Sequence, residues 1–156
     1  ARNAEYQHMG TTLVCAVARS DMAVIGNIGD SRAYHITPEG IFQISRDHSV
    51  VENMVAKGDL TPLEARTHPN RNLITRALGP DIHAKADTFE LPWHKDEFLL
   101  LCSDGLVNTV SDQEMLFEVL HDGDVNECLD HLLQISLQRG APDNITAVLL
   151  LNEEGR

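Results

Sequence analysis

Basic residues, cysteines and long apolar runs are all scarce in this chain of 156 residues. The 12 Lys and Arg residues stand against 24 Asp and Glu, which gives a formal net charge of −12. That charge argues against binding to nucleic acid or to an anionic membrane, because both require basic patches. The longest uninterrupted apolar run extends only from Leu13 to Ala18, so the sequence predicts no membrane-spanning helix.

The three cysteines, Cys15, Cys102 and Cys128, lie far apart in the sequence. An odd number without metal-type spacing predicts reduced, buried thiols and a cytoplasmic protein, since disulfides are typical of secreted proteins. Apolar and charged contents of 42% and 23% are ordinary for a soluble globular protein. The length is typical of one domain, so we interpret residues 1–156 as a single domain.

Short apolar stretches separated by turn residues predict antiparallel β-strands. Residues 11–18 and 97–102 are apolar on both strand faces, which predicts strands covered on both sides, as in a layered sandwich. Further strands are expected at residues 22–28, 32–37, 41–45, 83–91 and 145–151.

Helix signals lie between and after these strands. One helix is expected to end at Gly58, and a second to begin at Thr61, which forms a capping box with Glu64. Two longer amphipathic helices, at residues 111–120 and 124–139, are expected to pack on a sheet. Together the strands and helices predict an α+β fold.

Three aspartates each stand at the boundary between an apolar strand and a tight turn. They are Asp30 in Gly-Asp-Ser-Arg, Asp104 in Ser-Asp-Gly and Asp143 in Pro-Asp-Asn. Taken singly, each is most simply a turn residue. If they converge, their carboxylates repel one another unless a cation joins them, and ligands that are all oxygen favour Mg²⁺ or Mn²⁺ over Zn²⁺. The residues alone leave both interpretations open.

Residues 67–82 form an arginine-containing stretch with Pro69, Gly79 and Pro80 in an otherwise acidic chain. The simplest interpretation is a mobile, solvated loop. A binding role is the alternative, because binding residues are frequent on loops that a rigid scaffold holds.

Four sequence blocks, in their order and spacing, resemble motifs of the metal-dependent protein phosphatase 2C (PPM) family of the compact bacterial type. These blocks are Met9-Gly10-Thr11-Thr12, Ile28-Gly29-Asp30-Ser31-Arg32, Leu100-Leu101-Cys102-Ser103-Asp104-Gly105-Leu106 and Asp143-Asn144-Ile145-Thr146. The segments between them, including Asp47-His48-Ser49 and residues 68–79, resemble the family's mobile flap segment. The resemblance covers essentially the whole chain.

The resemblance implies a sandwich of two antiparallel β-sheets flanked by helices, with a Mg²⁺ or Mn²⁺ site at one end. Asp104 and Asp143 match ligands of one metal, and Asp30, together with Asp104, matches a third metal position in bacterial members. Residues adjoining these ligands, expected to orient them, are Ser103, Gly105 and Asn144. Candidate substrate contacts in the flap are Arg71, Asn72 and Arg76.

The activity implied is hydrolysis of phosphoserine and phosphothreonine in proteins by a metal-activated water, with two or three ions in the complete domain. The implied partners are phosphorylated proteins and a cognate serine/threonine kinase whose action the phosphatase opposes. The resemblance also implies a bacterial signalling protein.

An Asp-Gly-Met-Gly-Gly-His type motif, an earlier acidic strand and a phosphate-binding arginine of the family have no counterpart in residues 1–156. We therefore expect the carboxy-terminal two-thirds of a phosphatase domain, with unpaired strand edges and exposed apolar surface. The general acid stays unassigned, and whether this chain is active by itself stays open. Two alternatives remain: a non-catalytic, phosphatase-like regulatory or binding module, and a metal-dependent hydrolase of small phosphate esters.

Overall fold

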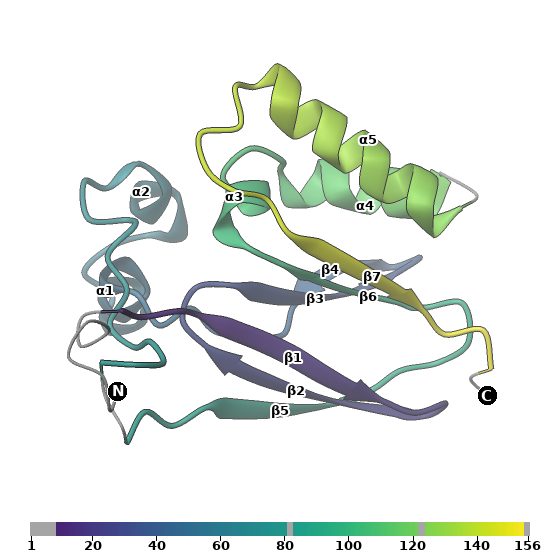
Figure 1. Cartoon of the computed structure of the whole chain (residues 1–156), viewed down its shortest axis with the longest axis horizontal. Coiled ribbons are helices and arrows are strands. Elements are labelled where there is room, and N and C mark those ends of the chain that lie inside the picture. Colours follow the sequence, from purple (N-terminus) through teal and green to yellow (C-terminus); the bar gives the residue numbers. More distant parts are fainter. Residues whose placement is uncertain (1–8, 81–82, 122–123, 155–156) are drawn as a thin grey trace.

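The computed structural model describes residues 9–80, 83–121 and 124–154 and shows two antiparallel sheets stacked face to face (Figure 1). One sheet has three strands in the order β1-β2-β5, and the other has four in the order β4-β3-β6-β7. The strands are β1 (Leu13–Ala18), β2 (Met22–Ile28), β3 (Arg32–Thr37), β4 (Gly40–Gln43), β5 (Asp87–Pro92), β6 (Phe98–Cys102) and β7 (Ala147–Leu151).

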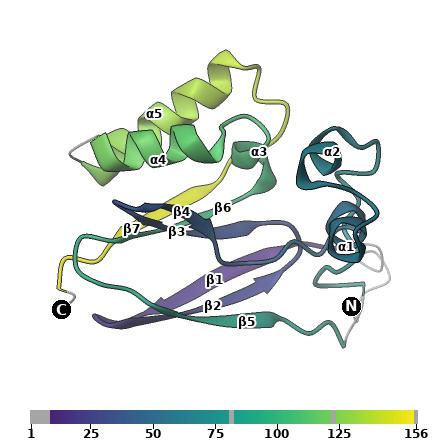
Figure 2. The same ribbon diagram turned by 180° about the vertical axis from the view of Figure 1, so that it is seen from behind.

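Helices cover the outer face of the four-stranded sheet and one end of the sandwich (Figures 1 and 2). The helices are α1 (Val50–Lys57), α2 (Pro62–Thr67), α3 (Asp104–Val107), α4 (Asp112–His121) and α5 (Val125–Gln138). Long helices α4 and α5 pack on the sheet, whereas α1 and α2 lie beside the end at which α3 begins. Every helix in the described residues is too short or too polar to cross a membrane.

Strand β6 is buried on both faces, as its uninterrupted apolar sequence predicts. Leu99 belongs to the core between the two sheets, together with Ile25 and Trp93. Its neighbour Leu100 points the other way, into the core beneath the helices, and both leucines are fully buried. The strand therefore packs against both cores, and this close packing holds its end rigidly.

Strand β1 contradicts the prediction of a doubly covered strand. Val14 and Ala16 pack against the core between the sheets, but Val17 on the other face is 69% exposed. In the part of the chain that the structure describes, no helix covers that outer face (Figure 2). Cys15 is exposed as well, so the prediction of a buried thiol is wrong there, whereas Cys102 and Cys128 are buried as predicted.

Several element boundaries differ from the sequence prediction, among them β1, which begins at Leu13 rather than at residue 11, and β4, which spans Gly40–Gln43 rather than residues 41–45. Strand β5 begins at Asp87 rather than at residue 83, because β2 offers partners only from Asn27, opposite Asp87, to Met22, opposite Pro92. Strand β7 begins at residue 147 rather than 145. Asp104 is the first residue of helix α3, not a turn residue.

The predicted helix ends are confirmed. Gly58 ends α1 with a positive φ of 80°, and Thr61 forms the capping box with Glu64. Ser111 and Glu114 bond each other's backbone N–H groups in a second box before α4. Of the predicted loop at residues 67–82, residues 81–82 lie outside the described part of the chain.

The expected strand edges and exposed apolar side chains are also present. Strands β1 and β7 each stand at an edge of their sheet. Val17 on β1 and Val148 on β7 are 69% and 50% exposed.

Candidate functional site

The three aspartates lie at one end of the sandwich, where β2 turns into β3, β6 meets α3 and a loop leads into β7 (Figure 1). Strand pairing brings these points together. Arg32 of β3 pairs with Cys102 of β6, which in turn pairs with Ala147 of β7. Asp30, Asp104 and Asp143 each stand a few residues from this row, so the sheet register sets their proximity.

Electrostatic interactions couple the three carboxylates in two pairs, Asp30 with Asp104 and Asp104 with Asp143. Burial, and then the charge of Asp104, raise the pKa of Asp30 above its ordinary value. Burial, and then the charge of Asp143, raise the pKa of Asp104. Asp104 is thus common to both pairs, and the negative charges there are only partly offset by Arg32, which lowers both pKa values.

The donor set suits a hard divalent cation, because crowded, partly buried carboxylates gain most from a bound positive charge. Among the described residues, however, no group of three or more His, Cys, Asp or Glu is placed to hold a metal together. The arrangement is therefore two carboxylate pairs that share Asp104. Each pair supplies fewer than the six oxygens that Mg²⁺ takes.

Contacts around Ser103 lock the Asp104 and Asp143 segments together. The Ser103 N–H donates to the Thr146 carbonyl at 2.9 Å, and the Thr146 N–H donates to Ser103 Oγ at 3.0 Å. Ser103 Oγ donates in turn to the Asn144 carbonyl at 3.2 Å. A Cβ on residue 105 would collide with that same carbonyl oxygen, so only glycine allows the close approach. Ser103, Gly105 and Asn144 therefore join the segments that carry Asp104 and Asp143, and their role in orienting metal ligands stays a prediction.

The Asp30 turn is closed by Gly29, whose φ of 106° lies in the left-handed region. A Cβ there would collide with the side chain of Thr12, from the Met-Gly-Thr-Thr block. The hydroxyls of Thr12 and Ser31 lie 2.9 Å apart across the turn. The first two sequence blocks are therefore in contact at the site.

The sequence interpretation did not single out the ion pair of Arg32 with Asp47. Arg32 donates from Nε and Nη2 to the Asp47 carboxylate, at 3.1 and 2.7 Å from Oδ2. Its remaining Nη1 donates to the Tyr34 hydroxyl at 3.0 Å. The side chains of Arg32 and Asp47 are 27% and 12% exposed, so this pair is well shielded beside the aspartates. Its only sequence signal was that Arg32 lies in the second of the four blocks and Asp47 in the Asp47-His48-Ser49 segment.

In the flap, Arg76 is engaged with the start of β5. Its Nη1 donates to Asp87 Oδ1 at 2.7 Å and to the Lys85 carbonyl at 3.0 Å. Arg71 and Asn72 are exposed. In the described residues, no hydrogen bond joins any of these three flap residues to the three aspartates, and their role as substrate contacts stays a prediction.

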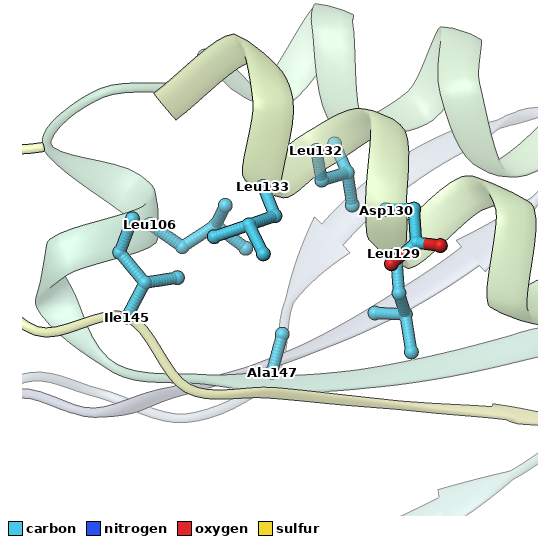
Figure 3. A pocket seen from close by; sticks show the side chains of 7 residues that line it. All are labelled: Leu106, Leu129, Asp130, Leu132, Leu133, Ile145 and Ala147. Atoms are coloured by element: carbon cyan, nitrogen blue, oxygen red, sulfur yellow. The ribbon is translucent and has the colours of Figure 1, made fainter. Parts of the chain in front are cut away.

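A cavity of about 160 Å³ opens between α3, α5 and β7 (Figure 3). Its lining residues are Leu106, Leu129, Asp130, Leu132, Leu133, Ile145 and Ala147. Asp130 is the sole charged group among them, and the rest are aliphatic. A phosphate ester requires positive charge or hydrogen-bond donors, so this cavity does not fit the substrate of the reaction implied by the sequence.

The sequence model of the family described as "Protein phosphatase 2C" matches residues 1–149. The chain belongs to the protein phosphatase 2C family. The resemblance drawn from the four blocks is thereby confirmed.

Curated relatives from bacteria agree with this family. "Serine/threonine phosphatase stp" of Listeria monocytogenes is 37% identical over 151 residues, which cover 95% of this chain and 60% of the relative. "Serine/threonine protein phosphatase PstP" of Mycobacterium tuberculosis is 37% identical over 146 residues, covering 93% of this chain and 28% of that protein. This protein phosphatase 2C chain therefore spans less than two thirds of the length of these relatives.

Solved structures confirm the predicted sandwich. A bacterial serine phosphatase superposes with a TM-score of 0.92 at 42% identity, covering 99% of this chain and 63% of the other. The catalytic domain of PstP, solved in complex with two manganese ions, superposes with a TM-score of 0.81 at 33% identity. That match covers 92% of this chain and 59% of the PstP chain.

Proposed function

We propose that this chain carries part of the active site of a protein serine/threonine phosphatase that requires Mg²⁺ or Mn²⁺. The observation that supports the proposal most directly is the sharing of Asp104 between two carboxylate pairs, one with Asp30 and one with Asp143. The same three residues stand in the sequence blocks that resemble the family's motifs, and relatives whose match covers nearly the whole chain are named serine/threonine phosphatases.

In this proposal Asp104 and Asp143 hold one cation, and Asp104 and Asp30 hold another. When bound, such cations would supply a water of lowered pKa and neutralise charge on the phosphoryl oxygens. The chain's own residues fix the ligands: Ser103 and Gly105 keep the Asp104 segment against the Asp143 loop. Arg32, held by Asp47, partly offsets the raised pKa of both Asp30 and Asp104 and so favours the ionised forms that bind a metal.

The proposed substrates are phosphoserine and phosphothreonine in proteins, and the opposing partner is a serine/threonine kinase. We place the protein in the signalling of the bacterial cytoplasm. The bacterial origin of the relatives and the buried thiols of Cys102 and Cys128 support this placement.

The test is phosphate release from a phosphothreonine peptide, with and without Mn²⁺, by the full-length gene product and by this chain of 156 residues. In the full-length protein, Asp104→Asn should lower Mn²⁺-dependent kcat/KM at least about 100-fold, since a charged metal ligand becomes neutral. Unchanged activity in this variant would contradict the proposed role of Asp104.

Asp124→Asn is the matched control, because it makes the same chemical change at the N-cap of α5, where Asn caps as well as Asp. That end of α5 lies away from α3 (Figure 1). Full-length protein without any Mn²⁺-dependent activity would contradict the proposal and favour a non-catalytic module. Activity on p-nitrophenyl phosphate but not on phosphopeptides would favour a hydrolase of small phosphate esters.

A further inference from the structure

His48 joins the turn that carries Asp30 to the segment that carries Arg76. Its side chain is buried, with the whole residue 6% exposed. The N–H of Gly29 donates to His48 Nδ1 at 3.0 Å, and His48 Nε2 lies 2.9 Å from Oδ2 of Asp87. The imidazole thus connects the backbone next to Asp30 with a carboxylate at the start of β5.

These two contacts define the tautomer of His48. A backbone N–H can only donate, so Nδ1 must carry no proton. The ring proton of the neutral imidazole is then on Nε2, which donates to Asp87. Hydrogen bonds from His48 and from Arg76 hold the pKa of Asp87 below its usual range, which keeps this acceptor ionised.

Backbone hydrogen bonds reinforce the same connection on both sides. The His48 N–H donates to the Gly29 carbonyl at 2.9 Å, and the Thr75 N–H donates to the His48 carbonyl at 2.7 Å. Buried Asn27 adds a longer contact from Nδ2 to the Gly29 carbonyl, at 3.4 Å. Both peptide groups that flank Gly29 are therefore held, and the second of them ends at the nitrogen of Asp30.

We propose that His48 is a positioning residue for Asp30: its Nδ1 fixes the peptide plane before Gly29, and its Nε2 links that turn through Asp87 to Arg76 in the flap. The proposal rests on the proposed function, in which Asp30 and Asp104 hold a cation. In this proposal His48 acts on Asp30 only through the backbone of the turn, and not by contact with the carboxylate of Asp30 or of Asp104. Partners that orient ligands in this way typically change metal affinity 10- to 100-fold when they are removed.

Two variants separate the two contacts of the ring. In His48→Asn the side-chain amide reaches the position of Nδ1 and can still accept from Gly29, but the bond to Asp87 is lost. In His48→Gln the longer amide reaches the position of Nε2 and can still donate to Asp87, but the bond to Gly29 is lost. Both remove the ring, so both should lower thermal stability to a similar extent.

Mn²⁺ affinity of this chain, measured by isothermal titration calorimetry, is the first readout. His48→Gln should weaken binding about 10- to 100-fold, whereas His48→Asn should weaken it less than about threefold. Equal weakening in the two variants would overturn the proposal, because a purely structural role predicts no difference between them.

Nitrogen-15 NMR of the metal-free chain is the second readout, and it does not depend on the proposed function. We expect the His48 ring to carry its proton on Nε2, and the amide signals of Gly29 and Asp30 to shift in His48→Gln but hardly in His48→Asn. A proton on Nδ1 would overturn the proposal. A wild-type chain with these signals but no Mn²⁺ binding would contradict the metal function while supporting the positioning of the turn.

Discussion

Burial, and then the charge of Asp143, raise the pKa of Asp104, although one residue begins helix α3 and the other belongs to the loop before β7. Their proximity follows from the pairing of β6 with β7 and from the close approach of Gly105 to the Asn144 carbonyl. Burial, and then the charge of Asp104, raise the pKa of Asp30. Substitution of Asp104 should therefore change the pKa of Asp30, and substitution of Asp143 should change the pKa of Asp104.

Mn²⁺ should stabilise this chain, because a ligand that binds only the native state shifts the unfolding equilibrium. At a concentration ten times the dissociation constant the gain is about 1.4 kcal/mol, which corresponds to a Tm increase of about 3 to 6 °C for a domain of this size. Differential scanning fluorimetry with and without Mn²⁺ measures it. An equal increase in Asp104→Asn would show that the ion binds elsewhere.

Without metal, Asp104→Asn should be more stable than the wild type at pH 7. The pKa of Asp104 is raised in the folded state, so its contribution to stability is present below the unfolded pKa and is lost as pH rises through the folded pKa. The gain should be at most about 1 kcal/mol, because the side chain is partly exposed. Urea unfolding in EDTA at pH 3 and pH 7 measures the difference in stability between Asp104→Asn and the wild type. A gain that is larger at pH 3 than at pH 7 would contradict a raised pKa of Asp104 in the folded state.

Gly105→Ala should reduce both stability and Mn²⁺ affinity, because the new Cβ collides with the Asn144 carbonyl and pushes the Asp104 and Asp143 segments apart. A collision of this kind costs about 1 to 3 kcal/mol. Gly58→Ala is the matched control: its φ of 80° strains alanine by about 1 kcal/mol, but nothing lies near the added atom. Only the first variant should lose Mn²⁺ affinity, and a similar loss in both would contradict the explanation.

One thiol should react in the native chain. Cys15 is exposed, whereas burial raises the pKa of Cys102 to about 12 and Cys128 is also buried. Because the thiolate is the reactive form, iodoacetamide at pH 8 should add once to the folded protein and three times in urea. Intact mass spectrometry counts the adducts, and Cys15→Ser should remove the native one. A native adduct on Cys102 would contradict its burial.

Glu114→Gln should lower stability at pH 7 but not at low pH. The bond from Arg139 and those from Ser111 hold the pKa of Glu114 below its usual range. The contribution of ionised Glu114 to the stability of the fold is therefore present above the unfolded pKa of this residue, and it is lost as pH falls through the folded pKa. The effect should stay below about 1 kcal/mol, because both side chains of the pair are exposed.

Glu64→Gln is the control for that comparison. Glu64 closes the same kind of capping box with Thr61, and glutamine preserves such a box. The difference between the two variants in urea unfolding isolates the ion pair with Arg139. If the two variants lose the same free energy of unfolding at pH 7, the ion pair of Glu114 with Arg139 adds nothing measurable to stability.

Local sequence was sufficient wherever one segment determines its own structure. The capping boxes at Thr61 and Ser111, the glycine end of α1 and the doubly buried strand β6 all follow from nearest neighbours and from apolar runs. The same local patterns identified the family, and they singled out Asp30, Asp104 and Asp143, whose role as metal ligands stays a prediction.

Tertiary structure decided what depends on contacts between distant segments. The apolar sequence of β1 cannot reveal that its outer face lacks a covering helix among the described residues, so Cys15 and Val17 are exposed. The start of β5 follows from its pairing with β2, in which Asn27 lies opposite Asp87, and the proximity of Asp104 and Asp143 follows from the register of β6 and β7. The bridge from Gly29 through His48 to Asp87 joins three chain segments. Strand pairing and burial bring such groups together, and neither is a property of any one segment.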